Sequence, residues 1–544
     1  MAAGARGKKD QGPRETLSDP RSRLWSLASV AARMDNTKAA LPRGFRFSFP
    51  QVSVDPRQHT VLMNTSHPPH LFDLAKQSLL KDESWVPVAA QLIPFRLWEH
   101  LFVEAMSGRH SEIMKAMVAS WPSPCLDLDT LITDQQFHPL TLLSSVFKGL
   151  EVLLDQGPRH AAGQLSVLWP TIMEEESEIE FIGALEYLEM EKETPRKRKR
   201  EDCSMSAPRK AEVAVEVVAD LIFDTTEFYD LLSFLMWRVL AGKVLPRLCC
   251  QKLSFSDNLP HYEVTKKILQ SVQLDGVERL KICLKKRRDF LSVLAPYLSQ
   301  MVHLKTLQLQ HFMPQIWTSR RRTLNKGRAE ELESIFMQFT SQLAHLRQLQ
   351  HLHVDNVYLC GNIHHFLRHL EAPLETLSIS FVMCLLENAD IKSLSLYPCT
   401  SKLKALSFYN TTLAHINPDF LRAAIDRTSA TLERLDLAHC KLTDSHLNAI
   451  LPALSHCSQL QLFRFSGNCV GKSTLKKLLR RTVPTRKSRR LVLPLPYNMD
   501  RKDSSSLVSE FALLLKQLGV LSQVKVYRYQ PYILEFLEVL MELS

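Results

Sequence analysis

The chain has 544 residues, of which 45% are hydrophobic and 23% charged, as in folded proteins with about three domains or one long repeat array. This composition excludes disorder throughout. The 68 lysines and arginines exceed the 57 acidic residues, so the net charge is +11, and nucleic acid has to be considered as a partner until that charge is located.

Cysteine usage and the N-terminus bear on the compartment. The eleven cysteines run from Cys125 to Cys469 without a CxxC pair, so neither a disulfide framework nor a zinc site is predicted. Met1–Asp10 has no apolar segment after its basic residues, and no stretch approaches the about 18 apolar residues of a membrane span. We therefore expect a protein of the nucleus and cytoplasm without membrane contact.

The residue pattern divides the chain into five segments. Residues 1–65 lack a periodic apolar face, which predicts a disordered tail. Residues 66–165 have apolar spacings of three and four, which predict a small helical domain. Within residues 166–212, nine glutamates precede a basic run, a pattern typical of a solvated linker. Residues 213–243 are predicted to form a helical cap, and residues 244–544 a repeat domain.

The basic run in the linker has two interpretations. It suits the acidic groove of a nuclear import receptor, and it equally suits a solvated charge cluster without a receptor. Its members are Arg196, Lys197, Arg198, Lys199 and Arg200.

The repeat domain places leucine-like residues at n, n+3 and n+5. From Leu349 the register recurs at intervals of 25, 29, 29, 28 and 28 residues. Weaker copies begin at Leu245, Val277, Leu304 and Leu521. This period predicts an α/β fold, a leucine-rich-repeat solenoid (horseshoe) with short parallel strands and outer helices. A cysteine or asparagine at n+8, as in Cys440 and Asn468, is expected to bind backbone groups at each turn.

The concave face of such a solenoid is its usual binding surface. Residues at n+2, n+4 and n+6 point outward there, and their few acids and bases balance. A phosphate-binding surface needs a cationic stripe, so a protein ligand is expected and nucleic acid is not. The alternative is a face without a ligand, in a scaffold that binds through its edges. The predicted binding residues are His351, His353, Asp355, Tyr409, Arg434, Asp436 and Arg464.

The positive charge is concentrated outside that face. The linker run contributes +5, and Lys472–Lys502 contains eleven bases against Asp500, or +10, which leaves −4 for the remaining residues.

Motifs of catalysis are weak. Gly467–Thr474 (GNCVGKST) has one residue too few between its glycines for a phosphate loop, and His365 and His369 lack a third ligand. Neither an enzyme nor a metal or cofactor site is predicted. Leu150–Leu154 and Leu475–Leu479 match the LxxLL helix that binds nuclear receptors, but the same string is common in helical cores.

Several long stretches resemble the PRAME family (preferentially expressed antigen in melanoma) of leucine-rich-repeat proteins. The likeness extends from residue 71 to about residue 460. Its clearest parts are Leu74–Glu83, Gly108–Pro122, Ser271–Leu280, Ala372–Ser380 and Ser429–Leu460.

The resemblance implies a substrate receptor of a cullin-RING ubiquitin ligase, attached through elongin B/C to a cullin scaffold with its RING protein. An elongin-binding helix would then use Leu71, Ala75 and Leu79, which share one helical face. A cullin-selecting box would use Leu92, Pro94, Leu97 and Leu101. The alternative is a nuclear transcriptional corepressor in retinoic acid receptor signalling, which would act through LxxLL contacts with nuclear receptors without ubiquitin.

Overall fold

The computed structural model describes two compact units. Unit 1 comprises residues 71–169 with 215–216, and unit 2 comprises residues 217–542. The described residues are 71–90, 92–128, 131, 139–156, 165–169, 215–225, 230–285, 287, 289–311, 326–357, 363–380, 386–482, 490–496, 509–510, 513–514, 516–517, 524–528 and 538–542. The predicted tail therefore lies outside them, as do most of the predicted linker and its basic run Arg196–Arg200.

Unit 1 is mainly helical, as the apolar spacing predicts. Its buried side chains include Trp98 on α4, Met117 on α5 and Leu150 on α7, and the Trp85 indole donates a hydrogen bond to the Leu79 carbonyl at 2.7 Å. A short parallel pair, β1 and β2, was not predicted. The elements are α2 (Leu71–Leu79), α3 (Val86–Ala89), α4 (Phe95–Ser107), α5 (Ser111–Ala119), β1 (Cys125–Asp127), α7 (Pro139–Gln156) and β2 (Leu165–Leu168).

Unit 2 is built on a twelve-stranded sheet in which the strands from β6 to β15 follow chain order, with β4 and β16 at the two edges. All neighbours are parallel except β15 and β16, which are antiparallel. The strands of the sheet are β4 (Leu221–Phe223), β6 (Lys252–Phe255), β7 (Arg279–Cys283), β8 (Thr306–Gln310), β9 (His351–Asp355), β10 (Thr376–Ser380), β11 (Ala405–Ser407), β12 (Arg434–Asp436), β13 (Leu462–Arg464), β14 (Arg490–Pro494), β15 (Val524–Arg528) and β16 (Glu538–Glu542).

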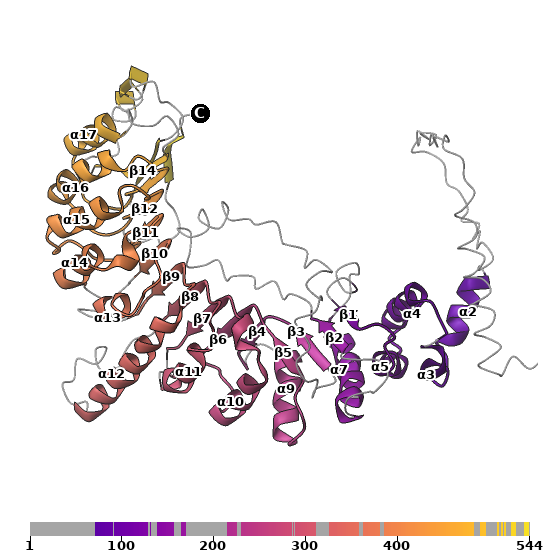
Figure 1. Cartoon of the computed structure of the whole chain (residues 1–544). Coiled ribbons are helices and arrows are strands. Elements are labelled where there is room, and N and C mark those ends of the chain that lie inside the picture. The colour runs from indigo at the N-terminus through magenta and orange to yellow at the C-terminus, as the bar shows by residue number, and fades with distance from the viewer. Residues whose placement is uncertain are drawn as a thin grey trace, which may run out of the picture. The chain divides into compact units, whose positions relative to one another are not determined.

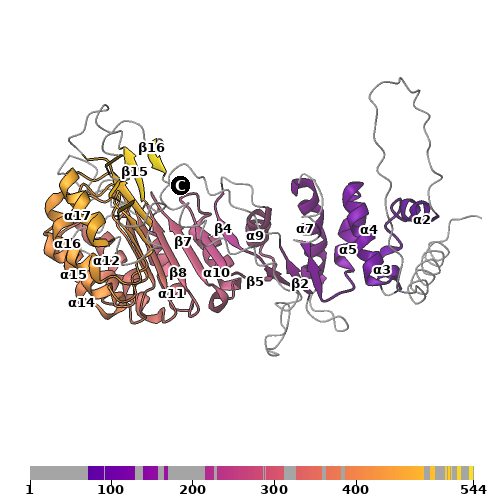
Figure 2. The ribbon, with the colours of Figure 1, turned by 90° about the horizontal axis from the view of Figure 1, so that it is seen from above.

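Helices connect these strands and form a layer on one side of the sheet (Figures 1 and 2). Sequential parallel strands require such crossovers, whose common handedness places the helices on one face. We call the opposite face of the sheet the inner face. The helices are α9 (Asp230–Leu240), α10 (Tyr262–Ser271), α11 (Phe290–Leu298), α12 (Lys326–Ser341), α13 (Ile363–Leu367), α14 (Asn388–Leu396), α15 (Pro418–Thr428), α16 (Asp444–His456) and α17 (Lys472–Thr482).

The repeat pattern places its apolar residues as predicted. Leu432, Leu435 and Leu437, at n, n+3 and n+5 of one copy, are buried between sheet and helices, as are the same positions of the other clear copies. Strand, buried leucines and returning helix recur in register from β9 to β14. Unit 2 therefore has a leucine-rich-repeat-like α/β fold.

Two predictions near the start of unit 2 hold only in part. The segment expected as a helical cap forms strands β3 (Val215–Val218) and β4 before α9 begins. The copy assigned to Leu245 gives β5 (Arg247–Cys249), which lies outside the twelve-stranded sheet, and the strand in register is β6. The strands were missed because the runs VEVV and LIF are only four and three residues long. Their burial alternates as in a strand, but such short runs do not show a two-residue period in the sequence.

None of the helices in the described part of the chain is long and apolar enough to cross a membrane.

Candidate functional site

Strand register aligns the predicted binding residues in rows across the inner face. Because successive side chains alternate between faces, n+2 and n+4 lie opposite the buried leucines. His353 pairs with Ser378 and, further along, Asp436 with Arg464 in the n+4 row. His351 and Arg434 belong to the n+2 row. The structure thus brings the predicted residues onto one face.

The inner face has a partly exposed part and a buried part. Side chains of β8 and β9, including His351, His353 and Asp355, are partly exposed. On β12 and β13, Asp436 is 2% and Arg464 6% exposed. The prediction that these last two present a binding surface is therefore wrong.

The reason is that the two buried charges, one positive and one negative, compensate each other. Adjacent in-register strands bring the Arg464 Nη1 within 3.4 Å of the Asp436 Oδ2. The other carboxylate oxygen of Asp436 accepts a hydrogen bond from the Ala438 backbone amide at 2.9 Å. Two charges removed from water are tolerated when each has such partners, so this pair belongs to the interior of the sheet face.

A second cluster follows the strand ends at position n+7. His439 has a positive φ of 58°, and its ring meets Tyr409 edge-on at 5.7 Å between centroids. Burial raises the pKa of Tyr409 and, together with the Arg464 charge, lowers that of His439. A Cβ at Gly467, which has φ of 70°, would lie 2.3 Å from the His439 Nδ1, so only glycine fits there.

Sequence reasoning missed this turn position. The recurrence of His311, Asn356, Asn410 and His439 at n+7, all with positive φ, is the signal that could have found it, because asparagine and histidine tolerate the left-handed region best after glycine.

The partly exposed part of the inner face carries one uncharged histidine, His353, and additional bases. Burial, and then the neighbouring His351, lowers the pKa of His353 to about 4. His351 Nδ1 lies 3.0 Å from the Thr376 hydroxyl. Register adds Arg279 and Lys281 of β7 to the same rows. The predicted balance of acids and bases on this face did not include these two residues. This part of the face offers amides, hydroxyls and a mixed set of charges.

The perturbed His353 predicts a pH dependence of stability. An unfolded histidine titrates near pH 6.5, whereas folded His353 titrates near 4. Between these values the unfolded state binds a proton that the folded state does not, so the free energy of unfolding falls as pH decreases through this window. We expect the free energy of unfolding, measured with urea, to fall less between pH 7 and pH 5 in His353→Gln than in the wild type. Equal declines in both proteins would contradict the assignment.

The predicted ligase-binding residues of unit 1 differ in how far they are buried. Leu79, Leu97 and Leu101 are buried in the unit's own core, so the expectation that they face a partner is not met in this structure. They are the apolar positions that hold α2 and α4 to the rest of the unit. Ala75 is half-buried and Pro94 exposed, and Leu92 is 62% exposed. Leu71 begins α2, but its side chain lies outside the described residues.

The remaining sequence motifs are explained by packing. The leucines of both LxxLL strings, in α7 and α17, are buried, as the core interpretation predicts. Asn468, in the phosphate-loop-like string, accepts from the Leu442 amide at 2.9 Å and donates to two carbonyls. His365 is close to His364 on α13, and burial lowers its pKa to about 4. Across the described residues no group of three potential metal ligands occurs.

Comparison with known proteins extends over most of the chain. A family model described as the PRAME N-terminal domain matches residues 68–176, and one described as the PRAME C-terminal domain matches residues 215–527. PRAME family member 12 of Homo sapiens is 33% identical over 437 residues, 80% of this chain and 86% of that protein. Preferentially expressed antigen in melanoma-like protein 1 of Mus musculus is 33% identical over 419 residues, 76% and 86% of the two chains.

Among solved structures, an LRR protein of Leptospira interrogans aligns with 52% of this chain and 62% of its own, at 16% identity and a TM-score of 0.26. This similarity is too weak to establish the fold, which is identified from the repeat itself. Both domain models match in order, and relatives share about a third of their residues over three quarters of the chain. The chain belongs to the PRAME family.

Proposed function

We propose that the protein is a non-catalytic substrate receptor of a cullin-RING ubiquitin ligase. Unit 1 would attach to elongin B/C and the cullin scaffold with its RING protein. The repeats, as a horseshoe, would hold a target protein for ubiquitination and proteasomal degradation. The receptor would act by proximity, because holding target and ligase on one chain raises the effective concentration of target lysines near the activated ubiquitin.

The observation that carries this proposal is a segment of seven residues in unit 1, Val88 to Pro94, that exposes Val88, Leu92 and Pro94. We call these three side chains the patch. Val88 and Leu92 are the large apolar side chains that the described part of unit 1 leaves more than half exposed. Apolar side chains gathered at a surface are typical of interaction sites, and covering a leucine contributes about 1.5–3 kcal/mol. The patch coincides with the start of the predicted cullin box, just before α4.

The residues proposed to contact the ligase are not all those of the elongin and cullin motifs. Leu79, Leu97 and Leu101 are core residues, so contacts with the ligase would come from the patch and from the half-buried Ala75 on α2. A small residue at that position lets a partner helix approach closely.

The corepressor alternative finds less support. A nuclear receptor groove takes the leucines of an LxxLL helix, and here Leu150, Leu154, Leu475 and Leu479 are all buried. Either helix would have to leave its unit before it could bind.

Replacing Leu92 by aspartate tests the proposal. Because Leu92 is exposed, Leu92→Asp leaves the core intact and places a charge at the centre of the patch. We expect co-purification of the cullin with tagged full-length chain from cultured cells to fall by about tenfold, the effect of a central interface residue.

The matched control is Leu396→Asp, because Leu396 on α14 is also 62% exposed but belongs to unit 2. It should retain cullin and elongin C at the wild-type level. If Leu92→Asp retained as much cullin as Leu396→Asp, the patch would not be the attachment site.

A further inference from the structure

Helix α17, which follows α16 in the helix layer, differs in charge from its neighbours. Its sequence KSTLKKLLRRT contains five bases and no acid. In α15 two aspartates balance two arginines, and α14 has one acid and one base. Equivalent helices of a repeat share the same packing duties, so this excess of charge is specific to α17.

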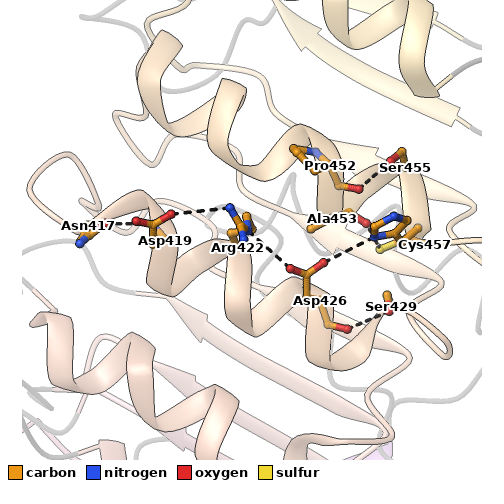
Figure 3. A network of polar contacts seen from close by, with 10 residues as sticks. Asn417, Asp419, Arg422, Asp426, Ser429, Pro452, Ala453, Ser455 and Cys457 are labelled. Atoms are coloured by element: carbon orange, nitrogen blue, oxygen red, sulfur yellow. Dashed lines mark hydrogen bonds and ion pairs between the residues drawn. The ribbon is translucent and has the colours of Figure 1, made fainter.

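Neighbouring helices pair their charges among themselves (Figure 3). On α15, Arg422 lies 3.9 Å from Asp419 and 3.6 Å from Asp426. Asp426 is also 3.8 Å from the His456 ring at the end of α16. Three of the four charged side chains of α15 therefore have an oppositely charged neighbour on the same helix.

On α17 the bases divide into two groups. Lys472 and Lys476, one turn apart, both form ion pairs with the Glu510 carboxylate. Lys477, Arg480 and Arg481 are exposed, and within the described part of the chain they make no ion pair. At 100° per residue these three lie within about 100° of the helix circumference and about 6 Å of its length. We call these three residues the α17 basic face.

The stability of the fold does not explain this arrangement. Like charges three and four residues apart destabilise a helix, and Lys477 stands in that relation to both Arg480 and Arg481. Anchoring of α17 depends on Leu475, Leu478 and Leu479, which are fully buried on its other side. Neutral or acidic residues on the basic face would keep that anchoring and remove the repulsion.

We propose that the α17 basic face docks an acidic segment of a partner protein, separately from the inner face of the sheet. The Glu510 pairing shows that bases one turn apart on this helix hold a carboxylate, and Lys477 and Arg481 repeat that spacing. Charge complementarity thus indicates a segment with two or three closely spaced glutamates or aspartates.

Other anionic partners fit less well. Binding to nucleic acid gains affinity from many phosphate contacts along an extended path, and three bases over about 6 Å are too few. Binding in a membrane surface requires an inserted apolar face, whereas the apolar side of α17 is buried in its own unit.

Fluorescence anisotropy of the full chain with a labelled twelve-residue peptide of alternating glutamate and serine tests the proposal. We expect binding that weakens about tenfold in Lys477→Gln/Arg480→Gln/Arg481→Gln, since loss of charge complementarity acts directly on such contacts. The control variant Lys267→Gln/Lys392→Gln/Arg427→Gln removes three exposed bases from α10, α14 and α15 and should bind within twofold of wild type. A glutamine-serine peptide should not bind.

Three results would overturn the proposal. Equal weakening in both variants would mean that only net charge matters. Tighter binding of a twenty-nucleotide oligo(dT), or of phosphatidylserine-containing vesicles, would assign the face to nucleic acid or membrane. Unchanged peptide binding in the α17 variant would remove the site. Cullin co-purification is independent of all three, so this test and the test of the ligase proposal fail separately.

Discussion

Asp436→Asn is expected to lower the free energy of unfolding by about 3–5 kcal/mol, the usual cost of leaving one member of a buried ion pair without its partner. The substitution keeps the shape of the side chain and its amide contact with Ala438, but it leaves the Arg464 guanidinium facing a neutral group. Both side chains are almost fully excluded from water. Urea unfolding followed by far-ultraviolet circular dichroism measures the change.

Two controls separate this effect from a general loss of charge. Asp426→Asn removes a carboxylate from the exposed network of α15, where ion pairs contribute about 0–1 kcal/mol, so its unfolding curve should nearly match wild type. Asp436→Asn/Arg464→Met removes both buried charges and should recover most of the loss. If the double variant were no more stable than the single one, the loss would not arise from an uncompensated charge.

The same pair shows where sequence reasoning reaches its limit. Asp436 and Arg464 stand at n+4, a position that faces away from the leucine core, and the period correctly places them on the inner face. Their burial depends on neighbouring strands bringing opposite charges into register 28 residues apart. The pattern within one repeat does not show which charge the next repeat places beside it. Asp436 and Arg464 were therefore predicted at the surface, whereas the structure buries them.

The repeat core was predictable for a complementary reason. Leu374, Leu403, Leu432 and Leu460 recur at nearly constant intervals, and each interval contains one strand followed by one α-helix. Burial at n, n+3 and n+5 then follows from strand geometry alone. Before Leu304 the copies weaken, and there the strands β3 and β4 were missed.

Unit 1 gives the same lesson for a candidate interface. An amphipathic pattern such as Leu71, Ala75 and Leu79 identifies one apolar face of a helix, but it does not say whether that face meets the same chain or a partner. The structure assigns Leu79 to the core and exposes Leu92 instead. Experiments on the ligase proposal should therefore target the exposed patch, since serine at Leu79 would damage folding and binding together.

Asn468 offers the second large effect on stability. Its buried side-chain amide accepts a hydrogen bond from the Leu442 amide and donates to the carbonyls of Leu437 and Phe465 at 2.7 and 2.8 Å. These bonds tie the turn after β13 to the preceding repeat. Asn468→Ala leaves buried backbone groups without partners, each at a cost of about 1–3 kcal/mol, and we expect a total loss of about 3 kcal/mol in urea unfolding.

The preceding repeat supplies the matched control for that experiment. Cys440 occupies the equivalent n+8 position and donates from its thiol to the Phe408 carbonyl at 2.9 Å. Asn468→Cys keeps one such contact and a small buried side chain, so it should be clearly more stable than Asn468→Ala. Because both turns then use the same chemistry, equal destabilisation by alanine and cysteine would show that the side-chain hydrogen bonds of this position do not hold successive repeats together.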